Sequence, residues 1–195
     1  MASKYHMHTH RWGTISNGLT IFRLLASPVI AILLYQAAWW NAMVLFVVAS
    51  FTDLLDGYCA RAFNQQTWLG TILDPLADKC LLLSTFGALT FFHVPLFHIP
   101  VWFFVVVLGR EICMVVGSVV AMLFFKNISV SPTWSGKATT MLHMIFLAWI
   151  FICYFMQWLP QKTYGCFLMF LAFFSLFSFV HYVYRLIFEL RKNKR

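Results

Sequence analysis

Four aspartates gather in one short window of this sequence, and their type and spacing are suited to chemistry. Asp53, Asp56, Asp74 and Asp78 are the only aspartates among the 195 residues. The first two are three positions apart and the last two are four apart, so in helices each pair would share one face. Carboxylates with no histidine on the same stripes favour hard cations such as Mg²⁺ or Mn²⁺. Several carboxylates from two facing helices would suit two such ions, the arrangement used in phosphoryl transfer.

Small residues accompany the aspartates on the same two stripes. Gly57 and Ala60 continue the first stripe and Gly70 begins the second, which leaves space for a flat or bulky group beside the carboxylates. The short connection between the stripes predicts antiparallel neighbouring helices. With a rise of about 1.5 Å per residue, Asp53 would lie roughly 13 Å from the end of its helix and Asp78 roughly 12 Å from the start of its own. The spacing therefore predicts a shallow cavity.

The elements that must position these residues are predicted by the composition. Hydrophobic residues make up 62% of the chain and charged residues only 10%, which excludes an ordinary soluble domain. Because a membrane span needs about 20 apolar residues, we expect an all-α integral membrane protein with six transmembrane helices. It would form a single domain over residues 1–195, with an N-terminal segment at 1–17 and a basic tail at 188–195. The expected helices are 18–38, 41–62, 71–93, 99–124, 138–158 and 164–187.

The basic residues predict the orientation. Of 14 lysines and arginines, ten fall in the two tails, in the connections at 60–70 and 125–137, or at Arg185 near the end of the last expected helix, whereas the other connections hold only Lys162. By the positive-inside rule both termini are cytoplasmic, so the cavity opens to the cytoplasm. The net charge of +8 then belongs to cytoplasmic loops, and we expect no nucleic-acid partner. The expected location is the inner (cytoplasmic) membrane, crossed several times.

Other roles for the aspartates have to be weighed, because each costs about 2.5 to 3.5 kcal/mol at the centre of a membrane helix. They could pair with basic residues of the chain, or they could line the pathway of a small cation transporter. A transporter would need carboxylates accessible from both faces, yet the outer connections at 37–41 and 93–99 contain no acidic residue. A metal site is therefore favoured. The basic residues available for pairing are Arg23, Arg61, Lys79 and Arg110.

The complete pattern D-x2-D-G-x2-A-R-x8-G-x3-D-x3-D resembles the signature of the CDP-alcohol phosphatidyltransferases. Its fixed positions are Asp53, Asp56, Gly57, Ala60, Arg61, Gly70, Asp74 and Asp78. The resemblance implies a homodimeric membrane enzyme that transfers a phosphatidyl group from CDP-diacylglycerol to an alcohol and releases CMP. It also implies two Mg²⁺ or Mn²⁺ ions on the four aspartates, with Asp78 as general base. The CDP-binding residues implied are Gly57, Ala60, Arg61 and Gly70.

Further stretches resemble the members of that family whose acceptor is glycerol 3-phosphate and whose product is phosphatidylglycerophosphate. The similar stretches are Asn17–Arg23 with Pro28, Leu73–Lys79, Arg110–Ile112 and Gly136–Thr139. They imply Arg23, Arg110 and Lys137 as ligands of the acceptor phosphate. One position departs from the pattern, since Ser118 stands where those members usually have arginine. Cardiolipin synthases share the D-P-x-A-D-K stretch, so they, or a family member with another acceptor, are the alternative.

Overall fold

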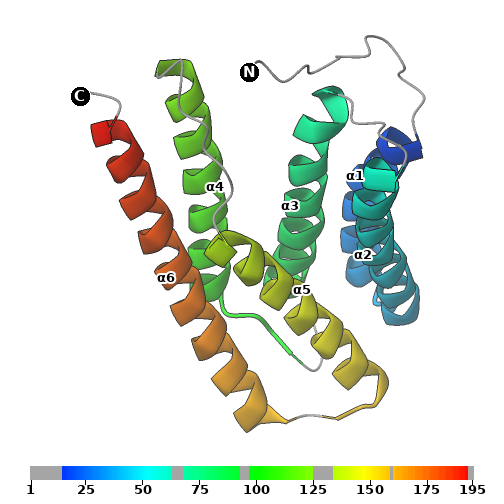
Figure 1. Ribbon diagram of the computed structural model, residues 1–195. Coiled ribbons are helices and arrows are strands. Elements are labelled where there is room, and N and C mark those ends of the chain that lie inside the picture. The colour runs from blue at the N-terminus through cyan, green and yellow to red at the C-terminus, as the bar shows by residue number, and fades with distance from the viewer. Residues whose placement is uncertain (1–14, 63–67, 93–96, 125–133, 159, 193–195) are drawn as a thin grey trace. The chain divides into compact units, whose positions relative to one another are not determined.

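The computed structural model describes residues 15–62, 68–92, 97–124, 134–158 and 160–192. The prediction of an all-α protein is confirmed, because the regular structure in these ranges consists of six helices. They are α1 (Ile15–Tyr35), α2 (Trp39–Ala62), α3 (Trp68–Phe91), α4 (Val101–Phe124), α5 (Trp134–Phe155) and α6 (Gln161–Lys192). Figure 1 shows them in chain order from blue to red.

The helix boundaries differ from the predicted ones chiefly at α5 and α6. Helix α5 begins at Trp134 rather than at residue 138, and α6 continues to Lys192 rather than ending at residue 187. The prediction followed the apolar runs, but a helix continues through polar residues wherever its backbone hydrogen bonds continue. The basic tail expected at 188–195 is therefore helical up to Lys192.

Three of the described helices are long and apolar enough to cross a membrane. They contain Gly18–Tyr35, Trp134–Phe155 and Gln161–Phe188, and Trp39–Thr52 is a shorter apolar stretch. Many large apolar side chains on these helices are exposed, among them Leu25, Phe51 and Phe173. Apolar surface of that extent is unfavourable in water but suits a hydrocarbon environment. The chain is therefore a multi-pass membrane protein.

The described helices fall into two compact units, residues 1–88 and residues 89–195. In the first unit, α1 and α2 lie side by side (Figure 1). Their buried residues recur every three or four positions, for example Ile30 and Leu34 on α1 and Ala42 and Phe46 on α2. This spacing places one face of each helix against the other. The small Ala42 allows the two backbones to approach closely.

Two tight reversals end helices α1 and α5. Ala37 and Gln157 have positive φ angles of 57° and 53°. The Ala38 amide donates to the Leu33 carbonyl over 2.9 Å, and the Trp158 amide donates to the Cys153 carbonyl over 3.0 Å. These bonds define Schellman motifs, which satisfy the last carbonyls of a helix and reverse the chain in a few residues.

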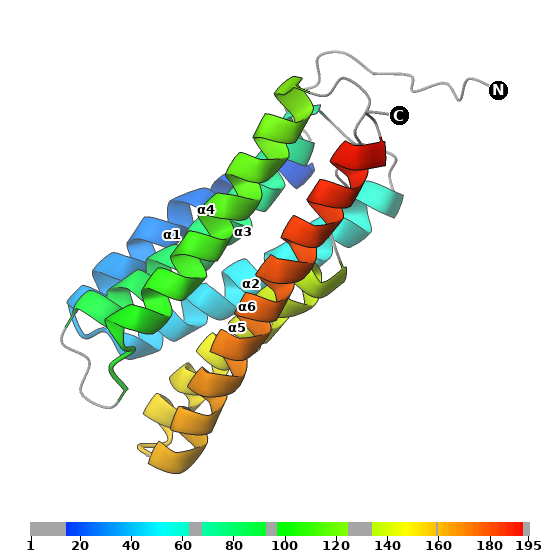
Figure 2. The same cartoon turned by 90° about the vertical axis from the view of Figure 1, so that its left-hand side faces the viewer.

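In the second unit, α6 packs against both α4 and α5, and in Figure 2 α5 lies behind the first half of α6. Contact between α4 and α6 is close at Gly117, where an added Cβ would lie 2.9 Å from the Tyr182 hydroxyl oxygen. That hydroxyl donates to the Met114 carbonyl over 3.2 Å. The absence of a side chain at Gly117 thus lets the tyrosine reach the backbone of α4.

Candidate active site

The aspartates occupy the helical positions that their spacing predicts. Asp53 and Asp56 lie in α2, and Asp74 and Asp78 lie in α3, so each pair shares one face of its helix. Of the four side chains, the structure describes only that of Asp78. The side chains of the other predicted site residues in α2 and α3 lie outside the described ones. These are Asp53, Asp56, Gly57, Ala60, Arg61, Gly70 and Asp74.

Asp78 forms an ion pair with Arg23 of α1. The Nη1 group of Arg23 donates a hydrogen bond to Oδ1 of Asp78. The arginine side chain is fully buried, whereas the aspartate side chain keeps 28% of its surface exposed. A charge-assisted bond of this kind is stronger than one between neutral groups. The alternative that an aspartate pairs with a basic residue of the chain is therefore confirmed for Asp78. Its carboxylate is nevertheless still accessible.

Arg23 belongs to a buried polar stripe on α1 that extends beyond the Asn17–Arg23 stretch. Thr20, Arg23 and Ser27 are all buried and recur at helical spacing. The Ser27 hydroxyl donates to the Arg23 carbonyl over 2.9 Å, one residue before Pro28. Polar residues at intervals of three and four in an apolar helix are the signal that could have revealed this stripe.

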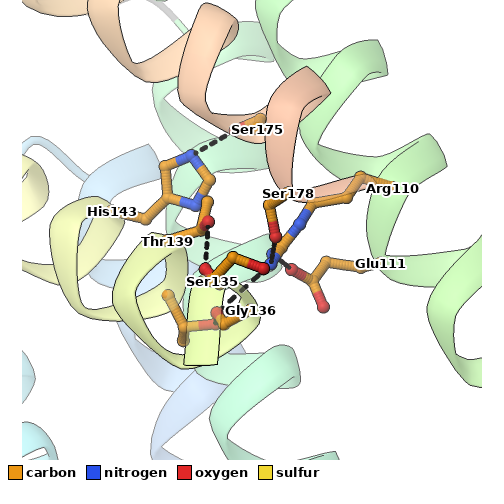
Figure 3. Close-up of polar contacts among 9 residues, drawn as sticks. Arg110, Glu111, Ser135, Gly136, Thr139, His143, Ser175 and Ser178 are labelled. Carbon is orange, nitrogen blue, oxygen red and sulfur yellow. Dashed lines mark hydrogen bonds and ion pairs between the residues drawn. The ribbon is translucent and has the colours of Figure 1, made fainter. Parts of the chain in front are cut away.

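A second group of buried polar residues lies in the second unit, where α4, α5 and α6 meet (Figure 3). Arg110 of α4 is 4% exposed, and its Nη1 group pairs with Glu111. Its Nη2 group donates to the Gly136 carbonyl of α5 and to the Ser178 hydroxyl of α6, each over 3.2 Å. One guanidinium therefore joins three helices.

Two further contacts between α5 and α6 flank this guanidinium. The Ser135 hydroxyl lies 2.7 Å from Nδ1 of His181, and the Ser175 hydroxyl lies 3.2 Å from Nε2 of the fully buried His143. Thr139 donates to the Ser135 carbonyl over 2.7 Å. Of these residues only Thr139 belongs to a stretch that the sequence singled out, although Ser175 and Ser178 recur at helical spacing within an otherwise apolar stretch.

The three cations proposed for the acceptor phosphate have different surroundings. Arg23 is buried and paired in the first unit, and Arg110 is buried and paired in the second. Lys137 is exposed in the first turn of α5 and directly follows Gly136, whose carbonyl binds Arg110. The structure thus connects Arg110 to the backbone beside Lys137. Among the described side chains, no three of His, Cys, Asp and Glu are grouped as metal ligands.

Comparison with known proteins decides the family. Residues 13–180 match the CDP-alcohol phosphatidyltransferase family over most of the chain. The chain belongs to this family. The resemblance read from the aspartate pattern is therefore confirmed.

Relatives of this chain include bacterial proteins. A CDP-diacylglycerol–glycerol-3-phosphate 3-phosphatidyltransferase of Aquifex aeolicus is 35% identical over 127 residues, which cover 65% of this chain and 69% of the relative. Proteins of the same name from Salmonella choleraesuis and Escherichia coli K12 are 33% identical over 136 residues, covering 68% of this chain and 73% of each relative. The names of these relatives favour a transferase over a cation transporter.

Proposed function

We propose that this family member transfers the phosphatidyl group of CDP-diacylglycerol to glycerol 3-phosphate, giving phosphatidylglycerophosphate and CMP in phospholipid biosynthesis. The observation that carries the proposal is the complete aspartate pattern on α2 and α3 in a chain whose relatives are named for this reaction. These names favour glycerol 3-phosphate over the acceptor of a cardiolipin synthase.

The donor set fits two divalent ions, because Asp53, Asp56, Asp74 and Asp78 offer only hard oxygen ligands. Mg²⁺ or Mn²⁺ would be held by these residues. When bound, such ions neutralise the diphosphate and stabilise the charge that develops on the departing CMP. The partial exposure of Asp78 beside Arg23 supports a site that both an ion and a substrate can reach.

The residues of the chain then have separate roles in one displacement. Asp78 accepts the proton of the acceptor hydroxyl, and the oxygen attacks the phosphorus that carries diacylglycerol. The bond from that phosphorus to the CMP oxygen breaks. Arg23 holds the Asp78 carboxylate in position. Room for the cytidine end comes from Gly57, Ala60 and Gly70, and Arg61 contacts its phosphate.

Lys137 is the candidate that best suits the acceptor phosphate. It is exposed and lies in the first turn of a 22-residue helix, where backbone N–H groups and the helix dipole favour an anion. Arg23 and Arg110 would have to exchange their present ion pairs for a phosphate to take that role. We therefore assign the phosphate to Lys137 first.

We also propose a membrane topology, a cellular location and an oligomeric state. Six spans with both termini in the cytoplasm would open the aspartate cavity to the compartment that supplies a soluble acceptor, while the acyl chains stay in the bilayer. The uneven distribution of lysine and arginine between the two sets of connections supports this orientation. Location in the inner membrane and assembly as a homodimer are expected from the family resemblance.

The test is an acceptor panel on the purified protein in detergent with Mg²⁺ or Mn²⁺. We expect CMP release from CDP-diacylglycerol with glycerol 3-phosphate, and little with phosphatidylglycerol, serine or inositol phosphate. EDTA should abolish the release, and added Mg²⁺ or Mn²⁺ should restore it. Release with phosphatidylglycerol alone would reassign the acceptor, and no release with any alcohol would refute the transferase. The matched blank omits the acceptor.

A further inference from the structure

We propose that Arg110 is a positioning residue, and that Glu111 and Ser178 orient it so that its bond to the Gly136 carbonyl holds Lys137 for the acceptor phosphate. The inference rests on the proposed function, because it concerns the acceptor of that reaction. It assigns roles to two residues, Glu111 and Ser178, that the sequence patterns do not associate with the site.

The first step concerns the guanidinium of Arg110. Its contacts reach Glu111 on its own helix, a carbonyl of α5 and a hydroxyl of α6 (Figure 3). Arg110, Glu111 and Ser178 are all at least nine-tenths buried. In such a setting water cannot replace a lost partner, so each bond restricts the guanidinium more strongly than it would at a surface. The orientation of Arg110 therefore depends on both Glu111 and Ser178.

The second step leads from Arg110 to Lys137. The carbonyl that Arg110 binds belongs to Gly136, which precedes Lys137 in the first turn of α5. The same carbonyl also accepts a hydrogen bond from the Thr140 hydroxyl of α5 over 3.2 Å. Of these two bonds, the one that ties the first turn of α5 to another helix is the bond from Arg110. Loosening it would let the backbone of Lys137 move, and a displacement of about 1 Å is enough to weaken a positioned contact markedly.

The third step is a matched pair of residues on α6. Ser178 and Ser175 are both fully buried serines, one helical turn apart. Ser178 accepts a bond from Arg110, whereas Ser175 pairs with His143, two turns further along α5 from Gly136. Removing either hydroxyl costs a buried hydrogen bond, but only the Ser178 hydroxyl bonds to Arg110 itself. Ser175 is therefore a close control for Ser178.

The experiment compares Ser178→Ala with Ser175→Ala in the full chain, and measures kcat and KM for each substrate by CMP release. Ser178→Ala should raise KM for glycerol 3-phosphate about tenfold, as expected for loss of one hydrogen bond to a charged group. KM for CDP-diacylglycerol should stay unchanged. Ser175→Ala should leave both KM values unchanged, even where it lowers thermal stability. Ser178→Thr, which keeps the hydroxyl, should return KM for glycerol 3-phosphate towards the wild-type value.

Several results would overturn the inference. Equal KM effects in the two serine variants, or an unchanged KM in folded Ser178→Ala, would show that the contact is only structural. Should Ser178→Ala fail to fold, Glu111→Gln carries the same test, because it weakens the other contact that orients Arg110, and an unchanged KM for glycerol 3-phosphate would refute the inference. Wild-type protein that releases no CMP with glycerol 3-phosphate would instead refute the proposed function.

Discussion

At the scale of single residues, the pairing of Arg23 with Asp78 shows how two charges are accommodated inside a membrane protein. The arginine is fully buried and the aspartate partly exposed, so loss of the aspartate would remove a charged partner from a buried guanidinium. Removing one partner of a buried pair typically costs about 3 to 5 kcal/mol, whereas replacing both is often nearly neutral. Asp78 thus contributes to stability as well as to the proposed proton transfer.

These two contributions can be separated with a double variant. Asp78→Asn should lower CMP release by about 100-fold or more through loss of the general base, and should lower the melting temperature as well. Arg23→Met combined with Asp78→Asn should recover most of the melting temperature because the buried guanidinium is removed together with its partner carboxylate, while activity stays lost. Arg23→Met alone is the matched single variant. Recovery of activity in the double variant would exclude Asp78 as the base.

At the scale of the helices, α1 and α5 end in the same backbone motif. Ala37 and Gln157 take the left-handed backbone conformation of the Schellman motif, where glycine is usual because other residues are strained. The chain uses residues with side chains at both positions. These connections belong to the set that contains few basic residues, so the motif reverses the chain at the end assigned to the outer face.

Glycine at these positions should stabilise the protein. Ala37→Gly and Gln157→Gly should each raise the free energy of unfolding by about 0.5 to 1 kcal/mol, because glycine adopts a positive φ without strain. Ala31→Gly, within α1, is the control and should lower it by about 1 kcal/mol. Thermal unfolding in detergent measures all three, and CMP release should stay at the wild-type level. Destabilisation at both positions would contradict the assigned strain.

At the scale of the whole molecule, the exposed apolar side chains and the distribution of charge point to the same environment. Leu25, Phe51 and Phe173 are exposed on their helices, as suits contact with lipid tails. Most of the basic residues outside the expected spans lie in the two tails and in two of the connections. Together these features predict which ends of each helix face the cytoplasm.

The orientation can be tested on α5 and the connection that follows it. In a variant whose five cysteines are replaced, Lys162→Cys at the start of α6 should react with a membrane-impermeant maleimide added outside spheroplasts. Trp134→Cys, at the exposed start of α5, should react only after the membrane is opened. The same labelling at both positions would exclude a membrane span between them, and the reverse result would invert the topology.

The sequence by itself determined the helical membrane fold, the family and the placement of both aspartate pairs. Apolar runs of sufficient length and a fixed spacing of polar residues are local properties, and helical geometry converts them into faces. Contacts between distant residues needed the tertiary structure. The pairing of Arg23 with Asp78, and of Arg110 with Gly136 and Ser178, joins residues 26 to 68 positions apart. Such contacts depend on how whole helices pack, because a buried charge takes whichever partners the neighbouring helices bring within reach.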